Sequence, residues 1–301
     1  MNRRYRDQVS LLLRVLPEVT KENCFALHGG TAINLFIRDM PRLSVDIDLT
    51  YIPIVDRATS LQNIQDALGR IKGYVAAAIK NIKITDNISS DAAKLFFSLN
   101  GVQIKLEVNL IKRGTLFAPV IMGLCKKAQE EFDSFCEMQI VSFGELYGGK
   151  ICAALDRQHP RDLFDVKLLL DNEGITEEVK IGFILFTVSG NSVMRKMINP
   201  NLHDQKDAFA HNFEGMTNES FTYSDFEETR LKLIDNLSNV LTQGDREFLL
   251  SVKGLTPKWN IYDFKQFPAV RRKLLNLEAF KKDKPEQYQE TYEHLKIALK
   301  R

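Results

Sequence analysis

Short apolar runs dominate the first half of the chain, whereas longer helical patterns dominate the second half. Four of the short runs read CFALHG, LSVDIDLTYI, KLFFSLN and VQIKLEVNLI. They are rich in β-branched and aromatic residues and partly alternate between apolar and polar positions, which is typical of β-strands. Helical patterns separate them, so this half predicts an α/β (α+β) domain with a mixed sheet.

The segment VSFGELYGGKICAALDRQ, from residue 141 to residue 158, predicts a helix. Ser142 and Glu145 have capping-box spacing, so the helix should begin near Phe143 and carry a lysine in its middle. The adjacent glycines 148 and 149 each weaken such a helix by roughly 1 kcal/mol relative to alanine. We therefore expect something to approach the backbone closely there. Pro160 and Gly174 predict the limits of the next helix.

Beyond residue 175 almost every segment has the pattern of a helix, including TEEVKIGFILFTV and PAVRRKLLNLEAFKK. Ser224 and Glu227 have the spacing of a second capping box. We therefore predict two domains. Residues 1–172 form the α/β domain, and residues 173–301 form an all-α helical bundle.

Composition narrows the class of protein. Charged residues make up 27% of the 301 residues and hydrophobic residues 44%, as in a globular protein, and the net charge is only +2. No apolar run approaches the ~20 residues of a membrane span, so we expect no membrane partner. The four cysteines are scattered without a C-x-x-C pair, which favours reduced thiols and a cytoplasmic location.

Two aspartates one residue apart are the first candidate for chemistry. Side chains alternate along a strand, so SVDIDL places Ser44, Asp46 and Asp48 on one face and its apolar residues on the other. Both carboxylates can then face an open cleft and converge on divalent cations. Hard oxygen ligands suit Mg²⁺, or Mn²⁺ in its place, which keeps positions for a substrate phosphate.

The segment CFALHGGTAINLFIRD, just upstream, predicts a strand, a tight glycine turn and a helix. Gly29 and Gly30 permit unusual backbone angles and remove the side-chain bulk that would block a phosphate. Thr31 and the first helical amides can donate hydrogen bonds to that phosphate.

Together these motifs resemble the AbiEii/AbiGii nucleotidyltransferase toxin family of the DNA polymerase β-like nucleotidyltransferase superfamily. The resemblance is carried by Gly-Gly-Thr-Ala at residues 29–32 and by Arg-x-Ser-x-Asp-x-Asp-Leu at residues 42–49. A later helix adds a lysine and an Arg-Asp-x-x-Asp motif, namely Lys150, Arg161, Asp162 and Asp165. The resemblance covers roughly residues 23–170.

The resemblance implies an enzyme that moves a nucleoside monophosphate from a nucleoside triphosphate to an acceptor hydroxyl and releases pyrophosphate. It points to the 3′ end of tRNA as acceptor and to a toxin with a cognate antitoxin. The implied catalytic residues are Asp46, Asp48, Glu107, Lys150 and Asp162, with Asp46, Asp48 and Glu107 as metal ligands. The implied nucleotide-binding residues are Gly29, Gly30, Thr31, Arg42, Ser44, Lys150 and Arg161.

Simpler interpretations stand beside this one. An Asp-x-Asp pair alone is usually a solvated strand edge, and Asp162 and Asp165 are also favourable charges in the first turn of a helix. Glu107 can pair with lysines on a solvated face. Two other functions also remain open, namely nucleotidylation of a small molecule or protein, and a catalytically silent nucleotide- or RNA-binding module.

Overall fold

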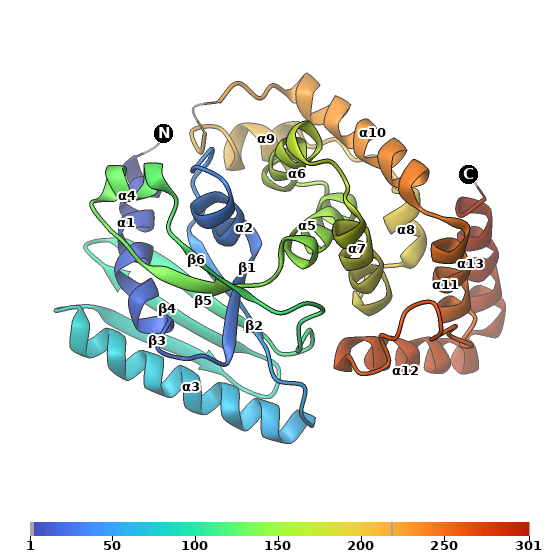
Figure 1. Ribbon diagram of the computed structural model, residues 1–301, viewed down its shortest axis with the longest axis horizontal. Helices are drawn as coiled ribbons and strands as arrows, with labels where there is room; N and C mark the ends of the chain where they lie inside the picture. Colours follow the sequence, from blue (N-terminus) through green and yellow to red (C-terminus); the bar gives the residue numbers. More distant parts are fainter. Residues whose placement is uncertain (1–2, 218, 301) are drawn as a thin grey trace. The chain divides into compact units, whose positions relative to one another are not determined.

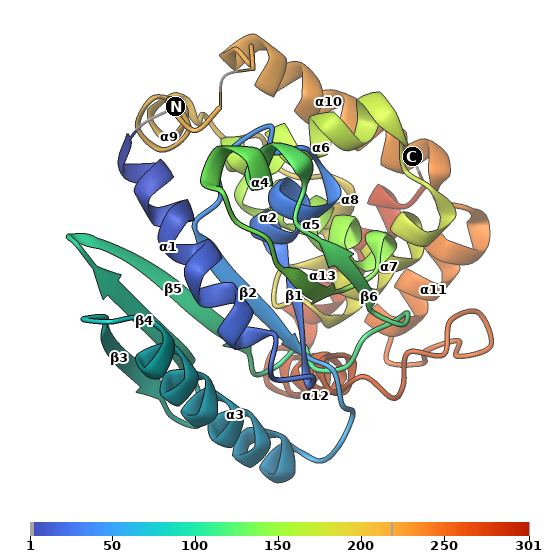
Figure 2. The same cartoon turned by 60° about the vertical axis from the view of Figure 1, so that its left-hand side comes forward.

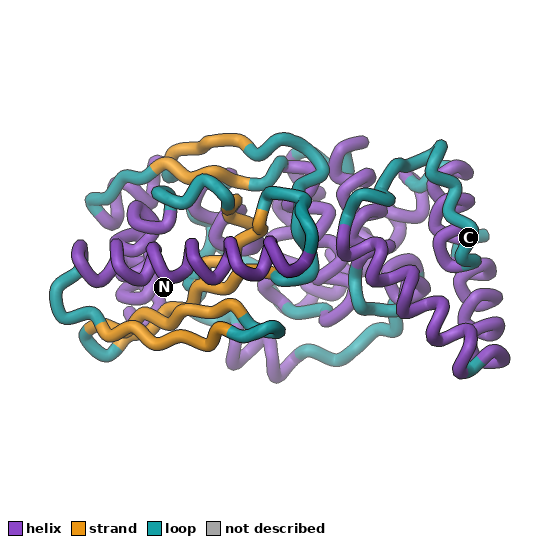
Figure 3. The backbone as a smooth tube through the Cα atoms, turned by 90° about the horizontal axis from the view of Figure 1, so that it is seen from below, coloured by secondary structure: helices purple, strands orange, loops and turns teal. Residues whose placement is uncertain are grey.

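The computed structural model describes residues 3–217 and 219–300, which fall into two compact units. One unit comprises Met1–Ser142 with Glu214–Ser220, and the other comprises Phe143–Phe213 with Phe221–Arg301. The strands, drawn in orange in Figure 3, all belong to the first unit. Within the described residues, no helix is both long and apolar enough to cross a membrane.

The first unit is built on one seven-stranded sheet with the order β3-β4-β5-β2-β1-β7-β6. Its elements are α1 (Arg3–Val19), β1 (Phe25–His28), α2 (Gly29–Ala32), the π-helical turn η1 (Ile33–Ile37), β2 (Asp46–Tyr51), α3 (Arg57–Ala78), β3 (Lys83–Ile88), β4 (Ala93–Leu99), β5 (Val102–Asn109), β6 (Val120–Gly123), α4 (Lys126–Phe132) and β7 (Glu137–Ile140). Helix α3 runs along β3 and β4 (Figure 1). The pairs β2–β5 and β1–β7 are parallel and the others are antiparallel. The predicted mixed sheet is therefore confirmed.

One face of this sheet is buried because its strands alternate as the sequence predicts. On β5, for example, Ile104, Leu106 and Val108 are buried, whereas the residues between them are half-buried. Helices α1 and α3 lie side by side over the buried face (Figure 2). The polar face, which begins with Asp46 and Asp48 on β2, is thereby left for chemistry.

The second unit is helical. It contains α5 (Phe143–Arg157), α6 (Pro160–Asn172), α7 (Glu177–Ser189), α8 (Met194–Ile198), α9 (Lys206–Asn212), α10 (Tyr223–Val240), α11 (Gln243–Lys253), α12 (Pro268–Asp283) and α13 (Pro285–Ala298). The predicted starts of α5 and α6 are confirmed, and so is the mostly helical C-terminal region. The second capping box was misplaced, because Thr222 and Asp225 form it instead of Ser224 and Glu227.

The compact units and the predicted domains differ in two places. Helices α5 and α6 pack with the helices that follow them, whereas the domain prediction of 1–172 and 173–301 groups them with the sheet. Residues 214–220 also return to the first unit from the loop before α10. There Leu43 N donates to Met216 O at 2.8 Å, and Thr217 Oγ1 donates to Pro41 O at 2.8 Å.

Candidate active site

The glycine turn lies directly against the second aspartate. Strands β1 and β2 run antiparallel, with His28 opposite Asp48, so the turn that follows His28 comes to the start of β2. Gly29 has φ +78°, and a Cβ added there would lie 2.8 Å from Asp48 Oδ2. A side chain at this position would clash with the carboxylate and strain the backbone, which explains why the turn uses glycine.

Gly30 is needed for a different reason, because it accommodates the side chains that precede the aspartates. A Cβ at Gly30 would lie 2.8 Å from Arg42 Nη2 and 2.9 Å from Ser44 Oγ. The Thr31 hydroxyl donates to Asp46 O and lies 3.0 Å from Ser44 Oγ. The two halves of the sequence motif therefore pack against each other, and this contact fixes where β2 begins.

The two aspartates share the polar face of β2 with residues of β5 beside it. In the parallel ladder Asp46 is paired with Lys105, and Asp48 is paired with Glu107. Lys105 Nζ lies 2.8 Å from Glu107 Oε2, and Lys94 Nζ of β4 lies 3.2 Å from Glu107 Oε1. The predicted third carboxylate thus lies next to the aspartates, but both of its oxygens contact lysines.

These charges shift one another's pKa values. Partial burial opposes ionisation of Glu107, yet the hydrogen bonds from Lys105 and Lys94 hold its pKa below the usual range. Burial likewise opposes the charge on Lys105, while the bond to Glu107 and the nearby charges of Asp46 and Asp48 raise its pKa. Both groups are therefore charged at neutral pH.

The donor set of the aspartate pair fits a hard divalent cation. Asp46 and Asp48 present carboxylates on one half-exposed strand face beside the glycine turn. Among the described residues, no group of three or more His, Cys, Asp or Glu side chains is already arranged as a metal site. The fit of this site to a divalent cation therefore rests on the aspartate pair, because the carboxylate of Glu107 contacts Lys94 and Lys105.

The second motif forms a buried ion cluster in the helical unit. Lys150 on α5 lies 3.0 Å from Asp162 Oδ1 and 3.0 Å from Asp165 Oδ2, and all three side chains are buried. Arg157 makes a two-pronged contact with the Asp162 carboxylate. Burial alone would raise the pKa of Asp162, but the charges of Lys150 and Arg157 hold it well below the usual range.

Arg161 lies beside this cluster in the first turn of α6 and is half-buried. Its backbone N–H donates to His159 Nδ1 at 3.2 Å, so His159 caps the helix that Pro160 begins. The aspartate pair belongs to the first unit and the Lys150 cluster to the second. The predicted contacts of Lys150 and Arg161 with a nucleotide stay predictions.

The glycines of α5 serve helix packing. A Cβ at Gly148 would lie 2.4 Å from the backbone of Gly182 on α7, and one at Gly144 would lie 2.6 Å from Glu178 O. The glycines predicted that something approaches the backbone of α5 closely, and that element is α7. This contact sets the position of α5, the helix that carries Lys150.

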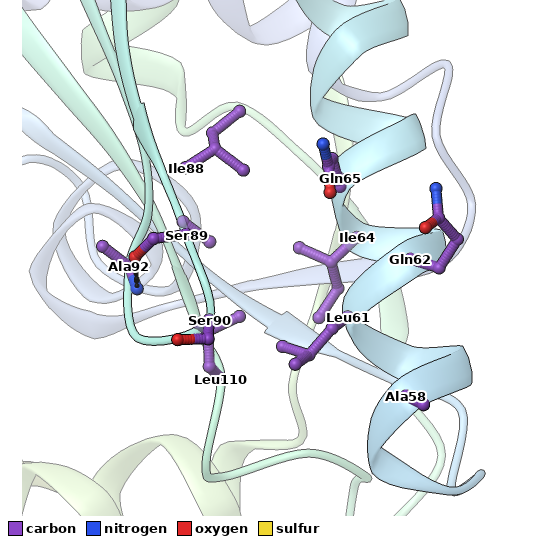
Figure 4. A pocket seen from close by; sticks show the side chains of 11 residues that line it. Ala58, Leu61, Gln62, Ile64, Gln65, Ile88, Ser89, Ser90, Ala92 and Leu110 are labelled. Atoms are coloured by element: carbon purple, nitrogen blue, oxygen red, sulfur yellow. Dashed lines mark hydrogen bonds between the residues drawn. The ribbon is translucent and has the colours of Figure 1, made fainter.

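A cavity elsewhere in the first unit has a different character (Figure 4). It measures about 270 Å³ and lies between α3 and the turn between β3 and β4. Glutamine and serine side chains provide its polar lining, and none of the described residues that line it is charged. Leu110, which lines it, directly follows β5 and is five residues beyond Lys105, or about 16 Å from the row of Asp46 in extended chain. This cavity therefore lacks the charged groups that would recognise a triphosphate.

Three features of these sites escaped the sequence analysis. Lys94 and Arg157 each contact a predicted site carboxylate, and residues 214–220 pair with the segment that holds Arg42. Arg157 is only five residues before Asp162 and is the last residue of the glycine-containing helix, so its spacing was a usable signal. The contact of Lys94 depends on the register between β4 and β5, and that of residues 214–220 depends on the packing of distant parts of the chain.

Comparison with known proteins identifies a matching family and a similar solved structure. The family model for the nucleotidyl transferase AbiEii toxin of type IV toxin–antitoxin systems matches residues 10–298. A similar solved structure is MenT4, a nucleotidyltransferase toxin from Mycobacterium tuberculosis H37Rv, with a TM-score of 0.63 and 12% sequence identity. The alignment covers 92% of this chain and 95% of that chain, which shows a shared fold. A search of curated protein sequences found no match.

Proposed function

The chain belongs to the AbiEii nucleotidyltransferase toxin family of type IV toxin–antitoxin systems, and from this we propose that it transfers a nucleoside monophosphate to the 3′ end of tRNA. The donor is a nucleoside triphosphate, as the family implies. Asp46 and Asp48 form the catalytic centre. The acceptor hydroxyl attacks the α-phosphorus, and the bond to the leaving pyrophosphate breaks.

The observation that carries the proposal is the contact between the glycine turn and the aspartates. The absence of a side chain at Gly29 avoids a clash with the Asp48 carboxylate, and Gly30 accommodates Arg42 and Ser44. Phosphate can therefore approach the backbone exactly where two carboxylates are held on one face. A solvated strand edge would need neither glycine, so this packing favours a phosphate-transfer site over the simpler interpretation.

Asp46 and Asp48 are the residues that would hold Mg²⁺ or Mn²⁺. When bound, the cation would neutralise the triphosphate and favour the ionised form of the acceptor hydroxyl. Glu107 stays paired with Lys94 and Lys105 and positions Lys105 beside Asp46. Lys105 then supplies a cation next to the carboxylates, where it limits their mutual repulsion and attracts phosphate.

The buried cluster of the second unit has a positioning role in this proposal. Lys150 has three N–H donors, and Asp162 and Asp165 accept two of them. Arg157 compensates the second aspartate charge, so the cluster holds the Lys150 side chain in one orientation. We assign Lys150 to the triphosphate and Asp162 to the orientation of Lys150, as the motif implies.

Isothermal titration with each of the four nucleoside triphosphates and Mg²⁺ tests the donor site. We expect one or more to bind, and Asp46→Ala and Asp48→Ala to weaken that binding at least tenfold. Asp91→Ala is the matched control, because Asp91 lies in an exposed turn. Absence of binding, or binding that both active-site variants retain, would contradict the proposal.

Labelled triphosphates incubated with total RNA, cell protein and metabolites test the acceptor. Label in tRNA supports the proposal, whereas label confined to protein or to small molecules selects the alternative acceptors. A catalytically silent module would label nothing. A gene for a DNA-binding partner beside the coding sequence would provide the expected antitoxin.

A further inference from the structure

Two rows of side chains lead from the aspartates across the polar face of the sheet. Residues paired between neighbouring strands lie side by side on the same face. The first row is Asp46, Lys105, Phe96 and Thr85, and the second row is Asp48, Glu107, Lys94 and Asn87. Lys83 and Ser98 begin a third row. We call the part of these rows on β3, β4 and β5 the open face.

The open face is accessible. Thr85, Asn87 and Lys83 are exposed, and the side chains of Lys94 and Lys105 keep about a third of their exposure, 33% and 32%. The alternate residues, such as Leu95 and Phe97 on β4, are fully buried on the side that α1 and α3 cover. The two sides of the same strands therefore differ strongly in solvent exposure.

The charge of the open face is positive. It carries Lys83, Lys94 and Lys105, while Glu107 is the one carboxylate on this side of β3, β4 and β5 as the structure describes them. The bonds of Lys94 and Lys105 to Glu107 use one N–H of each ammonium group, which has three. Donors remain for an anionic partner that lies across the strands.

Phe96 provides a feature that a purely electrostatic surface lacks. It is a half-buried aromatic ring on the polar side of β4, between Lys105 and Thr85 in the first row. Its strand is two strand spacings from that of Asp46, about 10 Å. A planar ring flanked by a lysine is the combination on which an unpaired base stacks while its phosphate meets the cation.

We propose that the open face binds the single-stranded 3′ end of the acceptor RNA and directs its terminal hydroxyl to Asp46 and Asp48. Bases hidden in a duplex cannot stack on Phe96, whereas splayed bases of a single strand can. The lysines complement the phosphates. This inference rests on the proposed transfer to a nucleic-acid hydroxyl, and it assigns the residues that recognise that acceptor.

Fluorescence anisotropy with a labelled 12-nucleotide single-stranded RNA and a blunt 12-base-pair RNA duplex tests the stacking. We expect the single strand to bind more tightly than the duplex. Phe96→Ala should weaken single-strand binding roughly 5- to 100-fold, the usual effect of losing one stacked base, and Phe96→Tyr should keep it. Phe135→Ala is the matched control, because Phe135 is 62% exposed and lies outside the open face.

The salt dependence of the same binding tests the lysines. Each phosphate contact that is lost should reduce the slope of log K against log salt by about 0.7 for a single strand. We expect this for Lys83→Met and Lys94→Met, and no change for Lys126→Met, which removes an exposed lysine of α4. Unchanged slopes in both open-face variants would overturn the electrostatic part of the proposal.

Titration with nucleoside triphosphate separates failure of this inference from failure of the proposed function. Phe96→Ala should bind triphosphate as the unaltered protein does, because Phe96 lies two strands from the aspartates. If the protein binds triphosphate but Phe96→Ala leaves RNA binding unchanged, the assignment of RNA binding to the open face is overturned and the proposed function stands. Preference for the duplex, or transfer of label only to protein, would overturn it as well.

Discussion

Replacing Gly30 with alanine tests whether the two halves of the catalytic motif depend on each other. The new Cβ would lie 2.8 Å from Arg42 Nη2 and 2.9 Å from Ser44 Oγ, while ordinary contact begins near 3.4 Å. Arg42 is only 2% exposed, so it has little room to move away. Both side chains must therefore retreat by about 0.5 Å or carry the start of β2 with them.

The expected effect on stability is small and the effect on activity is large. Overpacking costs about 1–3 kcal/mol, and alanine recovers up to about 1 kcal/mol of helix propensity, so the free energy of unfolding should fall by roughly 0–2 kcal/mol. Because Gly30 has no positive φ, backbone strain adds nothing. A 1 Å displacement of a catalytic group can cost ~100-fold in rate, so a shift of Asp46 by about 0.5 Å should reduce the transfer rate by about tenfold.

Urea unfolding and the initial rate of pyrophosphate release measure the two effects in the same preparation. Gly73→Ala on α3 is the control, because no atom lies within 4 Å of its added Cβ. It should stabilise the protein by up to about 1 kcal/mol and leave the rate unchanged. A Gly30→Ala enzyme with a rate within twofold of the unaltered protein would refute the reasoning.

Three further predictions concern the second unit. Gly148→Ala should lower the free energy of unfolding by about 2–3 kcal/mol in urea titrations, because its Cβ would lie 2.4 Å from the backbone of α7. Gly149→Ala should cost far less, because its Cβ would lie 3.2 Å from a phenylalanine ring. Equal effects of the two substitutions would contradict this packing. Asp162→Asn should cost roughly 3–5 kcal/mol near pH 7. The pKa of Asp162 is lower in the folded state than in the unfolded chain, so the stabilisation it provides is complete above the unfolded pKa of about 3.9 and is lost as pH falls below that value. The free energy of unfolding of Asp162→Asn should therefore decline less steeply on acidification than that of the unaltered protein. Burial lowers the pKa of Lys253 to about 8, so from pH 8 to pH 10 the unfolded chain retains a proton that the folded state has lost. Unfolding free energy should therefore rise by about 2 kcal/mol over this range, and a rise just as large in Lys253→Met would count against that assignment.

Local patterns in the sequence predicted the elements that hold the candidate site. Alternation in SVDIDL predicted that Asp46 and Asp48 share a face opposite buried Ile47 and Leu49, and the structure has this arrangement. Pro160 predicted the first turn of α6. These predictions succeeded because strand alternation and proline's fixed φ depend on neighbouring residues alone.

Signals that occur twice, or that depend on distant contacts, were less informative. Ser224 with Glu227 and Thr222 with Asp225 have equivalent capping spacing, and only the path of the chain selects the second pair. The return of residues 214–220 to the first unit joins positions more than 170 residues apart. Likewise, the contact of Lys94 with Glu107 follows from strand pairing, which the sequence of either strand alone does not specify, whereas Lys105 is two residues from Glu107 on the same strand.

Mass spectrometry of tRNA after incubation with the protein, each nucleoside triphosphate and Mg²⁺ tests the central claim most directly. We predict that the tRNA gains the mass of one or more nucleoside monophosphates, that the gain maps to its 3′ end, and that Asp46→Asn abolishes it. An unchanged tRNA with all four triphosphates, or a gain that Asp46→Asn leaves intact, would contradict the account.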